Sequence, residues 1–313
     1  MDRPELHSAL ITMKILLLGK NGQVGWELQR SLAALGEVVA LDRHSVSTEW
    51  GPLSGDLANL AGVRDTIRRV QPQVIVNAAA YTGVDKAETD RELAHTVNAL
   101  ASQVMAEEAQ ELGALLVHYS TDYVFDGSGS SAWKETDAVS PVNHYGATKL
   151  AGEQFIVASG CRHLIFRTSW VYAARGNNFA KTMLRLAKDR PALNVIADQI
   201  GAPTGAELLA DVTAIALQQT LVRPELSGIY HLAPAGELSW FDYARHVIDF
   251  ARAQGEALAV ETINPIATTE YPTPAERPLN SRLNTEKLRN NFSLHLPGWQ
   301  SGVTRMLTEV LNK

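Results

Sequence analysis

A tyrosine, a lysine and a threonine have the types and the spacing needed for proton transfer. Tyr145 and Lys149 lie in the segment YGATK, one helical turn apart, so a helix starting here would place both on one face. Thr121 follows the apolar run 115–119 and presents a hydroxyl. A phenol has a pKa of about 10 and works near neutral pH only when its anion is stabilised, which a neighbouring lysine can do. This spacing is also common on solvated helices, so the wider context decides its meaning.

A glycine-rich loop supplies that context. The apolar run 14–18 leads into GKNGQVG and then into a predicted helix, which spaces Gly19, Gly22 and Gly25 as G-x-x-G-x-x-G. Glycines permit a tight turn and a close backbone approach, so a diphosphate can bind the free N–H groups at the helix start. Asp42, at the end of the next apolar run, can accept hydrogen bonds from ribose hydroxyls. We therefore expect a nicotinamide dinucleotide at this loop.

The choice between NADH and NADPH stays open. Asp42 disfavours a 2′-phosphate, whereas Arg43 and His44 follow at once and could accommodate one.

With a nicotinamide cofactor, the expected reaction is reduction of a ketone. Tyr145 would protonate the alkoxide that hydride transfer produces, and Lys149 would lower the pKa of Tyr145 and hold the nicotinamide ribose. Thr121 would hydrogen-bond the substrate oxygen and polarise the carbonyl.

Two further segments are expected at the same edge of the sheet. Gly55-Asp56-Leu57 follows a predicted third strand and residues 77–82 follow a fourth, and nucleotides bind at the carboxyl ends of parallel strands. Small residues there would let adenine or ribose approach the backbone. The alternatives are that Asp56 caps a helix and that the alanines of 78–80 serve close packing.

Short apolar runs alternate with helical patterns from residue 13 onward, as in βαβ units. The pattern predicts strands at 14–18, 38–41, 74–76, 115–119 and 163–166 and helices near 23–35, 59–70, 92–112, 145–158 and 301–311. The predicted fold class is α/β, a Rossmann-type doubly wound parallel sheet with a smaller C-terminal α/β substrate-binding domain. We expect a disordered extension at 1–12, a dinucleotide-binding domain at 13–170 and a mainly substrate-binding domain at 171–313, from which some helices could return to the first sheet.

Composition excludes several classes of protein. The 313 residues carry a net charge of −6, which gives no basic field for nucleic acid. No apolar run reaches the roughly 20 residues of a membrane span, so a soluble protein is expected. The single cysteine, Cys161, indicates a reducing compartment, and we expect a cytoplasmic protein.

The motifs together resemble the extended short-chain dehydrogenase/reductase family. The resemblance is carried by GKNGQVG, by STDYVFDG around Thr121 and by YGATK. Further segments, in order, are similar to the members of that family that reduce the 4-keto group of a dTDP-linked 6-deoxy sugar. These segments are NAAAYTGVDKAE (77–88), HYSTDYVFDG (118–127), FRTSWVY (166–172), GNNFAKTML (176–184), DQIGAPTGAELLAD (198–211) and RPLNSRLNTEKL (277–288).

The resemblance implies two sets of binding residues. The implied cofactor contacts are Gly22, Gln23, Val24, Asp42, Asp56, Leu57, Ala80, Tyr81, Thr82, Tyr119, Tyr145 and Lys149. The implied substrate contacts are Val84, Asp85, Thr121, Asp122, Tyr145 and Trp170, with Asn178 and Arg277 as further candidates for a diphosphate-linked sugar.

Some members of the family bind magnesium through glutamates at a dimer interface. The resemblance places those ligands at Glu27, Glu207 and Glu309, which implies a possible homodimer with Mg²⁺. The alternative is that these are three solvated helix carboxylates.

Two rival functions would use the same glycine loop. A sugar-nucleotide dehydratase would need an Asp-Glu pair after the threonine, but Thr121 is followed by Asp122 and Tyr123, so the glutamate is missing. A non-catalytic dinucleotide-binding regulatory subunit would not need the intact Tyr145, Lys149 and Thr121.

Overall fold

A six-stranded parallel sheet forms the centre of the larger body in the computed structural model, which describes residues 13–44 and 46–312. The predicted extension at 1–12 lies outside the described residues. The strands, in spatial order, are β12 (Gly228–His231), β7 (Arg162–Thr168), β6 (Leu115–Thr121), β5 (Val74–Asn77), β1 (Lys14–Leu18) and β2 (Glu37–Leu41). The chain runs outward from β1 in both directions, so a topological switch point lies between β1 and β5.

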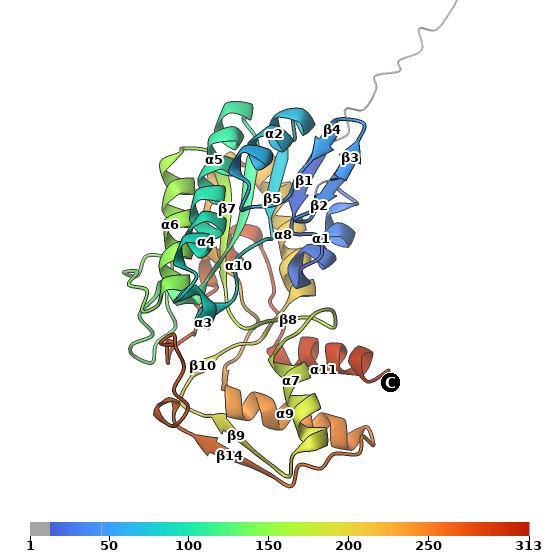
Figure 1. The fold of residues 1–313 in the computed structure, drawn as a ribbon, viewed down its shortest axis with the longest axis vertical. Helices are drawn as coiled ribbons and strands as arrows, with labels where there is room; N and C mark the ends of the chain where they lie inside the picture. Colours follow the sequence, from blue (N-terminus) through green and yellow to red (C-terminus); the bar gives the residue numbers. More distant parts are fainter. Residues whose placement is uncertain (1–12, 45, 313) are drawn as a thin grey trace, which may run out of the picture.

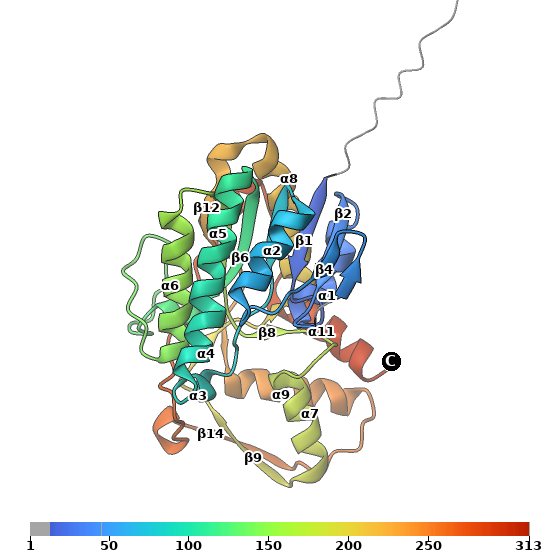
Figure 2. The same cartoon turned by 45° about the horizontal axis from the view of Figure 1, so that its top comes forward.

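Helices cover both faces of this sheet because β1 is apolar on both sides. On one face Ile15 and Leu17 pack with residues of α1 (Gln23–Leu32), α8 (Ala206–Val222) and α10 (Glu286–Phe292). On the other face Leu16 and Leu18 pack with residues of α2 (Leu60–Val70), α5 (Ala101–Leu112) and α6 (His144–Ala158). Figures 1 and 2 show the two helical layers with the sheet between them. The predicted doubly wound α/β fold is confirmed.

A second, smaller body has its own core. It contains α7 (Phe179–Asp189), α9 (Trp240–Ala253) and α11 (Trp299–Val310), and a parallel pair of strands, β9 (Ala192–Ile196) and β14 (Thr262–Ile266). Buried Met183, Leu184, Val247, Ile248 and Val303 belong to this core. It lies below the carboxyl edge of the large sheet in Figure 1.

The chain after Trp170 contributes to both bodies. Helix α8 packs on α1, β12 pairs with β7, and α10 packs on β12. The proposed boundary near Trp170 thus marks where the chain first leaves the sheet and does not separate two continuous halves.

The remaining elements are short. They are β3 (Val46–Thr48), β4 (Gly51–Leu53), α3 (Val84–Ala87), α4 (Arg91–His95), a π-helical turn η1 (Thr96–Leu100), η2 (Asp122–Val124), β8 (Val171–Tyr172), β10 (Ile200–Gly201), β11 (Thr204–Gly205), η3 (Pro224–Leu226), β13 (Leu238–Ser239) and η4 (Thr268–Glu270).

Three local predictions differ from the structure. The predicted third strand of the large sheet is wrong, because β4 pairs antiparallel with β3 in a separate hairpin, so Asp56 does not follow a strand of the parallel sheet. The predicted helix at 92–112 is interrupted by the π-helical turn. Strand β6 reaches Thr121, because its ladder with β7 continues to the pair Thr121 and Thr168.

Within the described ranges, we find no helix that combines the length and the apolar character needed to cross a membrane.

Candidate active site

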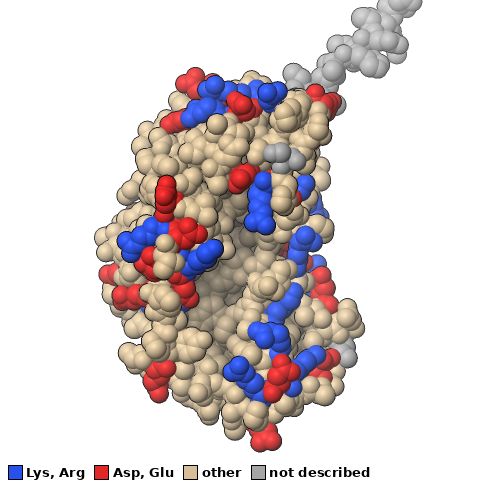
Figure 3. Space-filling view, viewed as in Figure 1, with Lys and Arg blue, Asp and Glu red and all other residues tan. Residues whose placement is uncertain are grey.

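The candidate site lies where the carboxyl edge of the large sheet faces the smaller body. Figure 3 shows the surface hollowed between the two bodies on this side. The loops after β1, β5 and β6 all open at this edge, because parallel strands end together.

The glycine loop and the loop after β5 abut at the switch point. Gly19 has φ +93°, and a Cβ on it would come within 2.7 Å of the backbone nitrogen of Ala79, so only glycine fits. Gly22 stands at the N-cap of α1 in an extended conformation, and a glycine has no side chain to cover the helix start. The first N–H groups of α1, from Gln23 to Gly25, are therefore suited to an anion such as a diphosphate.

Asp42 is held firmly at the end of β2. Its carboxylate accepts hydrogen bonds from the Asn21 side chain and, at 2.8 Å, from the backbone N–H of His44. Gly55 packs directly against the backbone of Asp42, which brings Asp56 beside the same strand end although β4 lies outside the sheet. The Asp56 carboxylate accepts a hydrogen bond from the backbone of Ala58, and the N-cap of α2 is Asn59.

The loop 77–82 is tied to the catalytic helix through one buried asparagine. Asn98, in the π-helical turn, accepts from the Tyr81 backbone N–H at 2.8 Å and donates to the Tyr81 carbonyl at 3.1 Å. The same amide donates to the Thr148 hydroxyl on α6 at 3.0 Å, and Thr148 donates to the Tyr145 carbonyl. The π turn thus fixes the loop 77–82, with Ala80 and Thr82, relative to α6.

Tyr145, Thr121 and Asp122 meet at the end of β6, and we name them the catalytic cluster together with Lys149. The Thr121 hydroxyl donates to the Asp122 carboxylate at 3.0 Å and also hydrogen-bonds Tyr145. Burial raises the pKa of Tyr145 to about 12, aided by the negative charge of Asp122, while the Thr121 hydrogen bond lowers it. Burial also raises the pKa of Asp122 to about 6. With a pKa this high, Tyr145 is a protonated phenol near neutral pH unless a further positive charge lies beside it.

Lys149 is 2% exposed and lies one turn along α6 from Tyr145. Its Nζ donates to the backbone carbonyl of Tyr119 at 2.6 Å and lies 3.1 Å from Nε2 of His118. Burial lowers the pKa of Lys149 to about 8, and the carboxylate of Glu153 opposes that shift. The Tyr119 side chain turns to the opposite face of the sheet, where its hydroxyl pairs with Thr213 of α8 at 2.6 Å.

Two of the implied substrate contacts bind each other. Arg277 donates to both carboxylate oxygens of Asp85, at 2.9 and 2.8 Å, and this ion pair lowers the pKa of Asp85. Val84 is the neighbouring residue at the start of α3. The pair joins α3, which follows β5, to the segment after η4, two stretches far apart in sequence.

Trp170 and Asn178 occupy the smaller body's side of the site. Trp170 has φ +49°, which is strained for a bulky side chain, and its ring stacks on Trp240 with centroids 3.5 Å apart. Asn178 is the N-cap of α7, and its amide donates to the Gln23 side chain at 3.1 Å, so it links the smaller body to the glycine loop.

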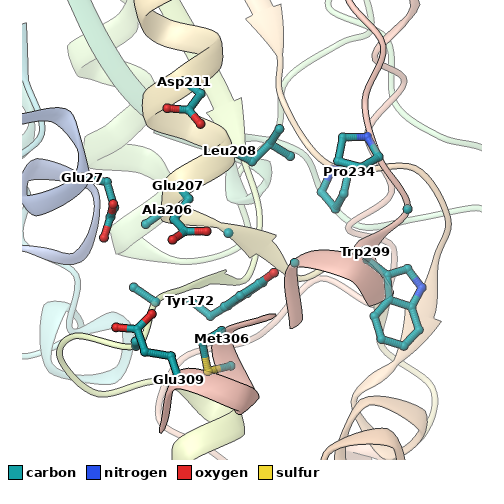
Figure 4. A pocket seen from close by; sticks show the side chains of 16 residues that line it. Glu27, Tyr172, Ala206, Glu207, Leu208, Asp211, Pro234, Trp299, Met306 and Glu309 are labelled. Carbon is teal, nitrogen blue, oxygen red and sulfur yellow. The ribbon is translucent and has the colours of Figure 1, made fainter. Parts of the chain in front are cut away.

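The three glutamates that the resemblance implied as metal ligands line one cavity away from the catalytic cluster. This acidic cavity, of about 160 Å³, lies between α1, α8 and α11 and also includes Asp211. Figure 4 shows the carboxylates of Glu27, Glu207 and Glu309 around it. Burial, and then the charge of Glu207, raise the pKa of Glu27.

No group of three histidine, cysteine, aspartate or glutamate side chains in residues 13–44 and 46–312 is arranged to hold a metal ion. Arg305 instead pairs with Glu207 at 3.2 Å. The carboxylates of a single chain therefore do not form a ready coordination shell.

Sequence reasoning missed His118, Asn77, Asn98 and Glu153. A signal was available for two of them, since His118 alternates with Ser120 along a strand and Glu153 follows Lys149 by one helical turn. Asn77 and Asn98 gave no comparable signal, because their partners are distant in sequence.

Comparison with known proteins identifies the family of this chain. The family model described as "RmlD substrate binding domain" matches residues 13–312. A dTDP-4-dehydrorhamnose reductase of Salmonella typhimurium is 59% identical over 298 residues, which cover 95% of this chain and 98% of the relative. A dTDP-4-dehydrorhamnose reductase of Burkholderia thailandensis is 48% identical, covering 96% of this chain and 100% of the relative.

A solved structure supports the same relationship. The dTDP-4-dehydrorhamnose reductase of Bacillus anthracis in complex with NADP has a TM-score of 0.84 and 35% identity, covering 96% of this chain and 100% of that one. The predicted resemblance is confirmed over nearly the whole chain. This chain belongs to the RmlD substrate binding domain family, whose relatives include these dTDP-4-dehydrorhamnose reductases.

Proposed function

We propose that this protein reduces the C4 ketone of dTDP-4-dehydrorhamnose with NADPH or NADH and forms dTDP-L-rhamnose. The observation that carries the proposal is the catalytic cluster itself, in which Tyr145 and Thr121 lie together at the end of β6, on the same carboxyl edge of the sheet as the glycine loop after β1. The names of the 59% identical relative and of the structural neighbour support the same substrate.

The residues at the switch point suit a nicotinamide dinucleotide. The start of α1 is open to a diphosphate, the glycine at position 19 lets the loop pack on Ala79, and Asp42 lies at the end of β2 to accept from a ribose. When bound, the cofactor supplies a hydride to the carbonyl carbon. The neighbour's NADP complex favours NADPH, and the fixed Asp42 carboxylate favours NADH.

The chain's own residues handle the proton and the developing charge. Thr121 donates a hydrogen bond to the carbonyl oxygen, which polarises the ketone, and Tyr145 delivers the proton that turns the alkoxide into a hydroxyl. A positively charged Lys149 stabilises the tyrosinate that remains and lowers the pKa of Tyr145. In the structure the single hydroxyl proton of Thr121 points at the Asp122 carboxylate, so the Thr121 hydroxyl turns from Asp122 to the substrate oxygen when the ketone binds.

The substrate side of the site is assigned to residues from both bodies. Arg277 suits the substrate diphosphate, because a guanidinium can donate two parallel hydrogen bonds to phosphate oxygens. Its ion pair with Asp85 orients the Arg277 side chain. Val84, Trp170 and Asn178 are the further proposed contacts.

The magnesium site, the homodimer and the cytoplasmic location are finer parts of this proposal. The residues of one chain that the structure describes do not form a coordination shell, so a cation would be held by Glu27, Glu207 and Glu309 with water or with the same residues of a second copy. The crowding of like charges that raises the pKa of Glu27 is the feature a cation would relieve. Sedimentation with Mg²⁺ and with EDTA tests this, and a dimer that neither EDTA nor Glu207→Ala changes would remove these glutamates from the proposal.

A coupled assay tests the reaction. Purified protein is given dTDP-4-dehydrorhamnose with NADPH and, separately, NADH, and oxidation of the cofactor and formation of dTDP-L-rhamnose are followed. We expect turnover with at least one cofactor. Cofactor binding without turnover would contradict the proposal and favour a regulatory subunit.

A further inference from the structure

A buried hydrogen-bonded chain leads from β5 through β6 to the catalytic lysine. Asn77, His118 and Lys149 are each at most 2% exposed. Nδ2 of Asn77 lies 3.2 Å from Nδ1 of His118, and Nε2 of His118 lies 3.1 Å from Nζ of Lys149. Lys149 in turn donates to the carbonyl of Tyr119. No role in the proposed reaction has yet been given to Asn77 or His118.

The orientation of the Asn77 amide determines which atoms donate and which accept in the hydrogen bonds from Asn77 through His118 to Lys149. The backbone N–H of Ala79 donates to Oδ1 of Asn77 at 3.1 Å, and an N–H can pair only with the amide oxygen. The amide nitrogen of Asn77 therefore faces His118 and donates to Nδ1. A neutral imidazole with an accepting Nδ1 carries its proton on Nε2.

The Nε2–H of His118 then points at Lys149. A neutral amine has a lone pair to accept this hydrogen bond, whereas an ammonium group has only donors. Asn77, His118 and Lys149 can all pair a donor with an acceptor when Lys149 is neutral. When Lys149 is protonated, its N–H groups and the Nε2–H of His118 are both donors, and they face each other without an acceptor.

We propose that His118 is a positioning residue for Lys149. The Nε2–H of His118 favours the neutral amine of Lys149. Because Tyr145 needs the charged form of Lys149 to lower its pKa, His118 thereby sets the upper pH limit of proton delivery by Tyr145. The inference rests on the proposed function for its kinetic consequence, and on geometry alone for the tautomer of His118.

Opposing charges around Lys149 complete the arrangement. Glu153, one turn along α6, favours the ammonium form, but Arg167 of β7 binds Glu153 with contacts of 2.6 to 3.2 Å and offsets much of its charge. At the other end of the site are Tyr145 of α6 and Asp122 of η2. Burial and the charge of Lys149 hold the pKa of His118 well below its ordinary value, which agrees with a neutral imidazole.

The tautomer is tested without substrate. Protein labelled with ¹⁵N-histidine is studied by long-range ¹H–¹⁵N correlation between pH 6 and 9, and the His118 signals are assigned by their loss in His118→Asn or His118→Gln. We expect a neutral Nε2–H imidazole that does not titrate over this range. A proton on Nδ1, or a cationic His118, would overturn the inference whether or not the proposed reaction occurs.

The kinetic test compares three variants by the alkaline limb of kcat/KM. In His118→Asn the shorter side chain keeps a group at the position of Nδ1 and loses the contact to Lys149. Lys149 then stays charged to higher pH, so the alkaline limb moves up by roughly one pH unit, about the effect of one hydrogen bond. His118→Gln restores a donor near the position of Nε2 and keeps the limb near its original place. His163→Asn is the matched control, because the His163 ring on β7 pairs with the carbonyl of Cys161 and not with Lys149, and it leaves the limb unmoved.

The sign of the shift decides between the possible roles. A limb that moves down in His118→Asn would mean that Nε2 accepts from the ammonium form, and an unmoved limb with reduced activity would mean a structural role. Either result, in a variant with normal thermal unfolding, refutes the assignment.

Discussion

Charge is arranged in opposite ways around Lys149 and in the acidic cavity. Beside Lys149 a fully buried carboxylate, Glu153, faces a fully buried guanidinium, Arg167, in a bidentate pair. In the acidic cavity Glu27, Glu207 and Glu309 share one space, and the arginines that pair with Glu27 and Glu207 are mostly exposed. The reason is solvation, since a buried charge requires a partner, whereas like charges can gather where water reaches them.

The comparison also separates two uses of charge. The paired charges at the sheet edge stabilise one arrangement of α6 and tune one lysine, so changes there should be large. The partly exposed charges of the acidic cavity are screened by water, so changes there should be small and dependent on pH.

Tyr145→Phe should have the largest effect. It removes the proton donor of the buried cluster, and we expect kcat to fall by about 10²- to 10⁴-fold while cofactor affinity changes little. Steady-state kinetics and cofactor titration measure both. The matched control is Tyr123→Phe, because the ring of Tyr123 packs edge-on against that of Tyr145, with centroids 5.7 Å apart. The kcat of this variant should stay within about tenfold of the original value. Equal losses in both variants would argue against the assigned donor.

Arg167→Met tests the paired side of the comparison directly. It leaves Glu153 buried without its partner, and we expect a loss of about 3–5 kcal/mol in the free energy of unfolding. Urea denaturation measures it. The double variant Arg167→Met with Glu153→Leu removes the stranded charge and should recover a large part of the loss. A double variant no more stable than the single one would show that packing, and not charge pairing, is what Arg167 supplies.

Arg277→Met should have a smaller effect, confined to the substrate. Loss of a charge-assisted contact to the diphosphate should raise KM for the sugar nucleotide by about 10- to 100-fold. The Kd of the cofactor should not change, because the hydrogen bonds of Arg277 go to Asp85, Thr273 and Ala275 and not to the glycine loop. Arg245→Met, a change to an arginine on α9 that pairs with Asp242, is the control and should leave KM unchanged. Unaltered KM in Arg277→Met would place the diphosphate elsewhere.

Glu27→Gln should have the smallest effect, and its sign distinguishes the two regions. The pKa of Glu27 is raised in the folded state. The contribution of Glu27 to the free energy of unfolding is therefore most favourable below the ordinary carboxyl pKa and is lost as pH rises through the raised value. In EDTA at pH 7 the variant should therefore be more stable, by about 0.5 kcal/mol, and the gain should vanish near pH 4. Thermal unfolding at both pH values measures it. A loss of stability at pH 7 would mean that pairing with Arg30 outweighs the like charges.

The sequence predicted the large sheet well because its signals are local. Five of the strands of the large sheet were located from short apolar runs between helical patterns, and the glycine loop from spacing alone. The strand predicted before Gly55 is wrong as a member of the large sheet, because residues 51–53 (Gly-Pro-Leu) pair with β3 in a hairpin beside the sheet. The break in the helix at 92–112 was also invisible, since a π turn is set by what Asn98 must reach and not by propensity.

By itself the sequence determined the chemistry that this protein can carry, namely a dinucleotide loop after β1 and a tyrosine and lysine one turn apart. These follow from spacings within one strand or one helix, where geometry is fixed by the backbone period. Only the tertiary structure decided which charges are paired, that Arg277 meets Asp85, and that Asn77 and His118 lead to Lys149. Those contacts join residues tens to hundreds of positions apart, and their energies depend on burial, which the folded chain alone defines.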